Sequence, residues 1–129
     1  MRYLSIDEIL LLHEFQISKY GGSEGIRDIR LLESALFRPS TEFYGKELYK
    51  DIYEKAGILA IAIIANHPFL DGNKRTGIHA MLSMLEMNNI SIKIDPHYLA
   101  EIALSLATKK IELEALVKIL KDNTISKSR

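Results

Sequence analysis

The sequence predicts an all-α domain in which six or seven helices surround one central, buried helix. Apolar residues recur at helical spacing along most of the 129 residues, and one segment alone alternates as a strand does. The run over residues 56–65 is apolar on every side, as expected of a central helix. We find no repeat, low-complexity segment or linker, so a single domain over residues 1–129 is predicted.

The first two helices have clear start and stop signals. Ser5, followed three residues later by Glu8, forms a capping box that opens a helix, and Gly21 ends the apolar pattern. Asp28 is the expected cap of a second helix. Arg38-Pro39 ends that helix, because the residue before a proline is disfavoured in the helical region.

The central helix follows a loop. Residues 40–46 lack a helical period, so we expect a loop there with room for a short extended piece. The helical pattern resumes at about Leu48 and continues to Asn66. His67-Pro68 ends it for the same steric reason as before.

Three more helices are predicted in the second half of the chain. They span about residues 74–89, 95–106 and 111–120, and the second has a good start in an aspartate cap followed by proline. Residues 90–94 alternate for one short, strand-like step. The polar tail, residues 123–129, is expected to fray.

Composition excludes several functional classes. With 17 basic and 17 acidic residues, the chain has no overall field that would attract nucleic acid or an anionic membrane. The absence of cysteine excludes disulfides, thiolate nucleophiles and cysteine-based metal sites. No signal peptide is recognisable, and the longest apolar run is shorter than the roughly 18–20 residues that cross a bilayer. A cytoplasmic protein is therefore predicted.

The segment from His67 to Gly77 combines an imidazole, a carboxylate, an amide and two cations between two helices. The first turn of the following helix offers unpaired backbone N–H groups and the positive end of the helix dipole. Gly72 is expected to let a ligand approach this backbone, while Lys74 and Arg75 add formal charge. These features predict a polyphosphate site.

Two further residues of this segment are candidates for a chemical role, and a third is a candidate for a structural role. Asp71 is a hard oxygen ligand suited to Mg²⁺ beside a phosphate, and His67 is a candidate general base because histidine titrates near neutral pH. Phe69 is expected to anchor the loop in the core. Taken singly, each polar residue would more often be a helix end, a cap or a solvated cation, so the joint pattern carries the prediction. Packing or surface positions are expected for the other histidines, His13, His79 and His97.

Residues His67 to Arg75, which read HPFLDGNKR, resemble the signature loop of the Fic/Doc superfamily, H-x-F-x-[DE]-[GA]-N-x-R. Upstream elements within residues 21–28, 31–39 and 53–56 resemble the Doc (death-on-curing) branch, and the resemblance covers residues 1–107 approximately. It implies a Fic-like helical bundle with this loop between the central helix and the next one. It also implies that His67 activates a target hydroxyl, that Asp71 binds Mg²⁺, and that the phosphates of ATP are held by Gly72, Asn73, Lys74 and Arg75.

Lys74 bears on the reaction type. Family members that transfer AMP resemble G-N-G-R here, and the Lys74 side chain would occupy the space that the second glycine leaves for phosphates. The resemblance to Doc thus implies that the γ-phosphoryl group of ATP faces His67 and is transferred to a serine or threonine hydroxyl. Transfer of AMP or another nucleotide to a protein hydroxyl is the alternative. A non-catalytic binding module is the third possibility.

The Doc branch further implies a target and a partner. The target would be a threonine of translation elongation factor Tu, whose modification blocks translation. The partner would be a small Phd-like antitoxin with a disordered C-terminal segment, since this sequence has no match to the inhibitory helix motif [ST]-x-x-x-E-[GN] of many Fic proteins. The P-loop and the H-R-D loop of other phosphoryl-transfer enzymes are also missing.

Overall fold

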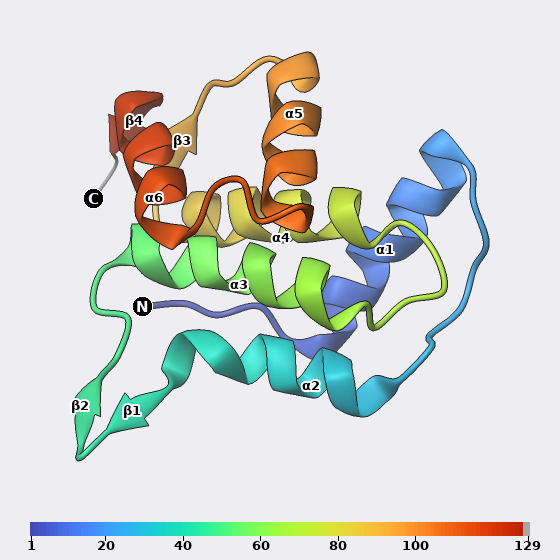
Figure 1. The fold of residues 1–129 in the computed structure, drawn as a ribbon, viewed down its shortest axis with the longest axis horizontal. Coiled ribbons are helices and arrows are strands. Elements are labelled where there is room, and N and C mark those ends of the chain that lie inside the picture. Colours follow the sequence, from blue (N-terminus) through green and yellow to red (C-terminus); the bar gives the residue numbers. More distant parts are fainter. Residues whose placement is uncertain (128–129) are drawn as a thin grey trace.

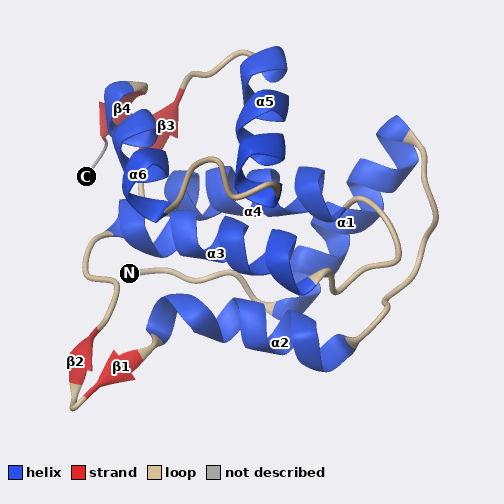
Figure 2. Cartoon of the chain, viewed as in Figure 1, coloured by secondary structure: helices blue, strands red, loops and turns tan. Residues whose placement is uncertain are grey.

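The computed structural model describes residues 1–127 and is mostly helical, which confirms the predicted all-α fold class (Figure 1). Figure 2 shows that strands make up only two small pairs at the edges of the helical body. The helices of the described residues are α1 (Ile6–Tyr20), α2 (Ile29–Phe37), α3 (Ile52–Asn66), α4 (Asn73–Met87), α5 (Pro96–Ala107) and α6 (Leu113–Asp122). The single domain proposed for residues 1–129 stays a prediction.

Helix α3 is the centre of the molecule, because it packs against α2, α4, α5 and α6 (Figure 1). Its closest partner is α4, and Gly77 makes this approach possible. A Cβ atom on Gly77 would stand 3.0 Å from Ile64 Cγ1 and 3.2 Å from the Ala60 carbonyl oxygen. The backbones of the two helices that flank the signature loop are therefore held close together.

Two predicted helix starts need correction. Helix α3 begins at Ile52 and not near Leu48, because Asp51 is its N-cap and accepts a hydrogen bond from the Glu54 N–H. Helix α6 begins at Leu113 and not near Ile111. Apolar periodicity continues outside both helices, and this explains why the pattern overestimates them.

The loop before α3 contains the extended piece that the sequence allowed. After the short 3₁₀ helix η1 (Arg38–Ser40), strands β1 (Glu42–Phe43) and β2 (Lys46–Glu47) form an antiparallel hairpin. Tyr44 and Gly45 connect them with φ angles of 52° and 76°. Two successive positive φ angles are typical of the tight turns that join such strands.

The prediction that residues 123–129 fray is wrong for most of this tail. Strand β4 (Thr124–Lys127) pairs antiparallel with β3 (Ile90–Ile92), which is the strand-like step predicted from the sequence. Local patterns do not show the partner of a short strand when the paired residues, such as Ile92 and Thr124, are far apart in the sequence, so the pairing was missed. The last part of the predicted tail, residues 128–129, lies outside the described residues. Among those described, no helix is both long and apolar enough to span a bilayer.

Candidate active site

The loop between α3 and α4 begins at His67, which caps the C-terminus of α3 in the left-handed conformation (φ 51°, ψ 53°). This conformation is uncommon for a residue with a side chain and needs support from its surroundings. Arg27 provides that support. Its Nε donates a hydrogen bond of 2.7 Å to the His67 carbonyl oxygen, and its Nη2 donates one of 2.8 Å to that of Asn66. The guanidinium thus closes the end of α3 and holds the backbone of the candidate base.

The segment between α1 and α2 runs beside the signature loop (Figure 1). The Arg27 N–H donates to the Pro68 carbonyl at 2.7 Å, and the Leu70 N–H donates to the Gly25 carbonyl at 3.1 Å. Ile26 and Phe69 form an isolated antiparallel bridge between these bonds. The loop is therefore braced along its backbone by a segment about 40 residues earlier in the chain.

Asn73 connects the end of the loop to its beginning. This residue is buried, its Oδ1 accepts the Phe69 N–H, and its Nδ2 donates to the Phe69 carbonyl, each at 3.0 Å. These two contacts fix the orientation of the amide, so Nδ2 also donates to Nδ1 of His67 at 2.9 Å. A neutral His67 ring then carries its proton on Nε2. The amide of Asn73, predicted to hold phosphate, is engaged in positioning His67 and the loop.

Phe69 is buried, with 1% of its surface exposed, and the ring of His13 stacks on it at 3.8 Å with an interplanar angle of 5°. Nε2 of His13 also lies 2.8 Å from the Asp71 carbonyl oxygen. The sequence placed His13 among the packing or surface histidines without a link to the site. No local signal connects it to a loop 56 residues away, whereas the fold of α1 against α4 makes the contact.

Gly72 is the N-cap of α4, and its φ of 78° favours glycine. An added Cβ would meet Ile17 Cδ1 at 3.1 Å and the His13 ring at 3.7 Å, so close packing against α1 also favours glycine here, and ligand approach to this backbone stays a prediction. The Gly72 N–H donates to Asp71 Oδ1 at 2.8 Å. No side chain caps α4, so the free donors are the N–H groups of the following first turn.

Asp71 presents an exposed carboxylate at this helix start. Hydrogen bonds from the backbone N–H groups of Ser23 and Gly72 lower the pKa of Asp71 below its ordinary value of 3.8, and the charges of Arg75 and His13 add to this effect. The carboxylate is therefore ionised at neutral pH. No group of three or more His, Asp or Glu side chains gathers within the described residues to hold a metal ion. Asp71 alone nevertheless fits Mg²⁺, which commonly takes one or two carboxylates and fills its shell with substrate phosphates and water.

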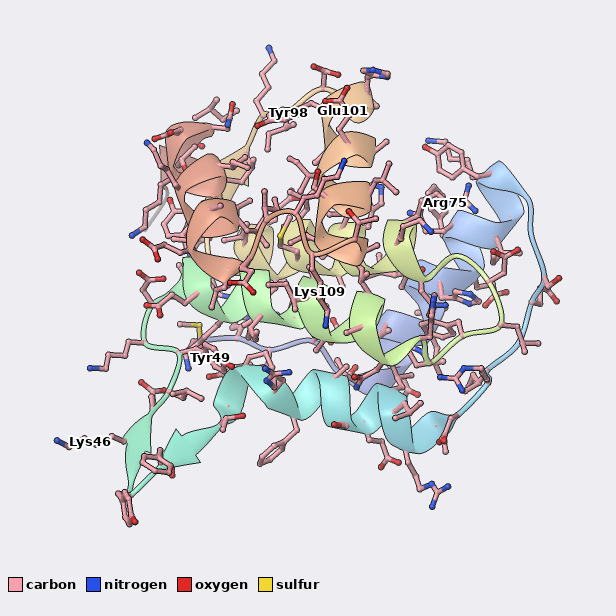
Figure 3. The ribbon with its side chains drawn as sticks, viewed as in Figure 1. Lys46, Tyr49, Arg75, Tyr98, Glu101 and Lys109 are labelled. Carbon is pink, nitrogen blue, oxygen red and sulfur yellow. The ribbon has the colours of Figure 1, made fainter. Side chains whose placement is uncertain are left out.

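Arg75 lies next to the C-terminal end of α1 (Figure 3). Its Nη2 donates to the Gly21 carbonyl at 3.1 Å, and its guanidinium carbon stands 5.1 Å from the centre of the Tyr20 ring. The guanidinium is half-buried but keeps further N–H groups for a ligand. Lys74 is exposed beside it. Two formal positive charges thus flank the uncapped start of α4.

Two cavities meet at Lys74. The first, which we call the α4–α5 cavity, has a volume of about 340 Å³ and is lined by Lys74, Arg75 and apolar residues of α4 and α5. The second, the histidine cavity, has about 630 Å³ and is lined by His67, Lys74, one face of α3 and the connection from α5 to α6. Lys109 of that connection reaches across α3 in Figure 3. Lys74 thus lines both cavities, whereas His67 lines the second and not the first.

The residues singled out in the sequence lie together, but their supports were missed. His67, Lys74 and the start of α4 form one exposed, cationic site. Asn73 and Phe69 face inward, so phosphate binding, which stays a prediction, would rest on Lys74, Arg75 and backbone N–H groups. Three supporting residues had no recognised role in the sequence, namely His13, Arg27 and Gly22. A Cβ atom on Gly22 would stand 2.7 Å from Asp71 Oδ2. The last two fall in the segment that resembles the Doc branch, which was the one available signal.

Comparison with known proteins agrees with this site. The family model described as the Fic/DOC family matches residues 3–85. The chain is 30% identical over 121 residues to "Protein kinase doc" of Escherichia phage P1, and the match covers 94% of each protein. It is 36% identical over 76 residues to "Toxin Doc" of Mycolicibacterium smegmatis, over 59% of this chain and 58% of that protein. The chain therefore belongs to the Fic/DOC family and, within it, to the Doc branch.

Proposed function

We propose that the protein is a Doc-type toxin that transfers the γ-phosphoryl group of ATP to a serine or threonine hydroxyl of a protein target. The observation that carries the proposal is the convergence of an exposed His67 with Lys74 and Arg75 at the uncapped N-terminus of α4. The names of the two relatives, a protein kinase and a toxin, support the same activity. The proposed acceptor is a threonine of translation elongation factor Tu, and its modification would block translation.

The reaction balances with groups that this chain supplies. His67 accepts the proton of the acceptor hydroxyl, the hydroxyl oxygen forms a bond to the γ-phosphorus, and the bond from that phosphorus to the β–γ bridging oxygen breaks to release ADP. Lys74, Arg75 and the backbone N–H groups of α4 stabilise the charge on the phosphate oxygens. Mg²⁺ held by Asp71 would supply further charge neutralisation.

The Asn73 contact adds a condition to this step. While Asn73 Nδ2 donates to Nδ1 of His67, the neutral ring carries its proton on Nε2, where it is a donor and not a base. Acceptance of a proton at Nε2 requires the ring proton on Nδ1, so the hydrogen bond from Asn73 must be released. We infer that substrate binding shifts this tautomer, with Asn73 as the positioning residue.

Transfer of AMP is the second candidate, and the histidine cavity favours it. This cavity borders His67 directly and has about 630 Å³, which is enough for a nucleoside whose α-phosphate faces the imidazole. In that arrangement Lys74 would hold the β- and γ-phosphates of the leaving pyrophosphate and not the transferred group.

Labelled ATP distinguishes the two reactions. The protein is incubated with a bacterial lysate, Mg²⁺ and ATP labelled either in the γ- or in the α-phosphate, with the His67→Ala variant as control. Label from the γ-position on a protein supports phosphoryl transfer, whereas label from the α-position supports nucleotidyl transfer. No transfer of either label would favour a non-catalytic binding module. Mass spectrometry of the labelled protein identifies the target and the acceptor residue.

Partner and compartment belong to the same proposal. Uncontrolled modification of a translation factor would harm the host, so we propose a small Phd-like antitoxin whose disordered C-terminal segment folds on the toxin in the cytoplasm. Expression of this chain alone should arrest growth, and co-expression of a Phd-like antitoxin that binds it should restore growth. Growth without arrest in the absence of any antitoxin would contradict this part of the proposal.

A further inference from the structure

We propose that Arg27, which lies outside the signature loop, is a positioning residue of the reaction, because its guanidinium fixes both backbone angles of His67 and thereby the place of the imidazole. This inference rests on the proposed γ-phosphoryl transfer. It adds to that function a residue of the connection between α1 and α2 on which the rate should depend.

Arg27 binds three successive carbonyl groups where α3 passes into the signature loop. Its Nη2 donates to the Asn66 carbonyl oxygen at 2.8 Å, and its Nε donates to that of His67 at 2.7 Å. Its backbone N–H donates to the Pro68 carbonyl oxygen at 2.7 Å. The end of α3 leaves the Asn66 carbonyl without a partner inside the helix, so the guanidinium supplies the missing donor.

The two side-chain bonds act on the two peptide planes that flank the Cα atom of His67. The Asn66 carbonyl belongs to the plane before this atom and the His67 carbonyl to the plane after it, so the orientation of these planes defines φ and ψ of His67. The two angles are 51° and 53°, in the left-handed region that a residue with a Cβ atom rarely adopts. A planar guanidinium with fixed N–H directions can hold both planes at once, whereas the ammonium group of a lysine lacks this fork.

The backbone angles of His67 determine the direction in which its imidazole points. The ring is also held by Asn73, whose Nδ2 donates to Nδ1 at 2.9 Å. The proposed function requires that bond to be released before Nε2 accepts a proton. The contacts of Arg27 still fix the His67 backbone at that stage, so we expect Arg27 to affect the reacting complex and not the binding of ATP.

The Arg27 side chain can be removed with little change to the rest of the fold. It is exposed, so its truncation leaves no cavity in the core. The backbone hydrogen bonds between residues 25–28 and the signature loop stay in place, because they need no side chain. A lower rate in a folded variant would therefore report the position of His67.

Arg30 provides the matched control. Its side chain is 87% exposed and pairs with Asp28 at 3.7 Å. Arg30→Ala removes the same type of side chain and the same charge three residues away, at the start of α2. Arg27→Ala removes both the charge and the fork at the signature loop, whereas Arg27→Lys keeps the charge and removes the fork. Circular dichroism establishes that each variant is folded.

Transfer of the γ-label from ATP to the proteins of a bacterial lysate is measured with Mg²⁺ at increasing ATP concentrations. We expect Arg27→Ala to lower the maximal rate by about 10- to 100-fold and to leave the KM for ATP within about twofold of wild type. Arg27→Lys should resemble Arg27→Ala, and Arg30→Ala should resemble the wild type. A wild-type rate in Arg27→Ala or in Arg27→Lys would overturn the inference. So would a raised KM with an unchanged maximal rate, which would make Arg27 a ligand of ATP.

An NMR measurement tests the conformation of His67 without any substrate. A positive φ brings the amide hydrogen of a residue close to its own Hα, so a strong NOE between these two atoms identifies the left-handed conformation. We expect this strong NOE for His67 in the wild type and in Arg30→Ala, and a weaker one in both Arg27 variants. An unchanged NOE in Arg27→Ala would show that other contacts fix the angles and would overturn the inference.

Failure of the inference and failure of the proposed function give different results. If the wild type does not transfer the γ-label, the proposed function fails, whatever the NOE of His67 shows. If the wild type transfers the γ-label and Arg27→Ala transfers it equally fast, the function stands and Arg27 is not a positioning residue.

Discussion

Replacing Phe69 by alanine tests whether the signature loop is fixed by its contact with the core. The ring is 1% exposed and stacks on His13. Its loss leaves a space between α1 and the loop that the backbone cannot close, because Asn73 and Arg27 hold the loop by hydrogen bonds to main-chain atoms that the substitution keeps.

The expected cost follows from this burial. Truncation of a buried phenylalanine to alanine costs about 3–5 kcal/mol, of which loss of the stacked ring pair accounts for about 0.5–1.5 kcal/mol. A domain of this length has a free energy of unfolding of roughly 6–19 kcal/mol, so the variant should fold but lose a large share of its stability. The melting temperature should fall by roughly 10–20 °C.

Differential scanning calorimetry of wild type, Phe69→Ala and Phe37→Ala measures this effect. Phe37, at the end of α2, is 70% exposed, so its truncation should change stability by no more than about 0.5 kcal/mol. A His13→Ala variant and the double variant complete a thermodynamic cycle, with an expected coupling of about 0.5–1.5 kcal/mol for the stacked pair. If Phe69→Ala melts within a few degrees of wild type, the ring is not the anchor that we infer.

Three further predictions concern the chemistry. His67→Ala should reduce phosphoryl transfer by about 10²- to 10⁴-fold and abolish growth arrest while the melting temperature stays close to that of wild type; a folded variant with full toxicity would exclude His67 as the base. Asp71→Asn should weaken Mg²⁺-dependent ATP binding. The variant should also lose less free energy of unfolding than the wild type as the pH falls. Because folding lowers the pKa of Asp71, its carboxylate stabilises the fold above the unfolded pKa, and this stabilisation is lost as the pH falls through the folded pKa. An identical acid profile would show that the bonds from Ser23 and Gly72 do not stabilise the fold. Lys74→Gly should abolish γ-phosphoryl transfer and allow weak transfer of AMP, measured with the two labels; α-label transfer by the wild type would contradict this interpretation of Lys74.

Sequence patterns predicted the helices well where a cap marks the boundary. Ser5, Asp28 and Asp95 each accept a backbone hydrogen bond at a predicted helix start. The start of α3 was misplaced although Asp51 is such a cap, because the apolar pattern before it suggested that the helix was already under way. A cap residue is thus better evidence for a boundary than the beginning of a periodic pattern.

The chemical residues of the site were also predictable, since they are contiguous in one loop. Their supports were not, because His13 and Arg27 act on this loop from 40 or more residues away. A single sequence contains no information on such pairs except through a resemblance to relatives. The positioning contacts of Asn73 were missed for a different reason: its type and position suit a phosphate ligand, which stays a prediction, and only its burial shows that the amide faces the loop.

Lys74 connects the reaction type to the orientation of the nucleotide. Transfer of the γ-label requires the nucleoside to be remote from His67, because the γ-phosphate is the end of ATP farthest from the nucleoside. Transfer of the α-label requires the nucleoside beside His67. Lys74→Gly removes a side chain that lines the same cavity as His67, so a change from γ-label to α-label in that variant would show that Lys74 determines which phosphate faces the imidazole.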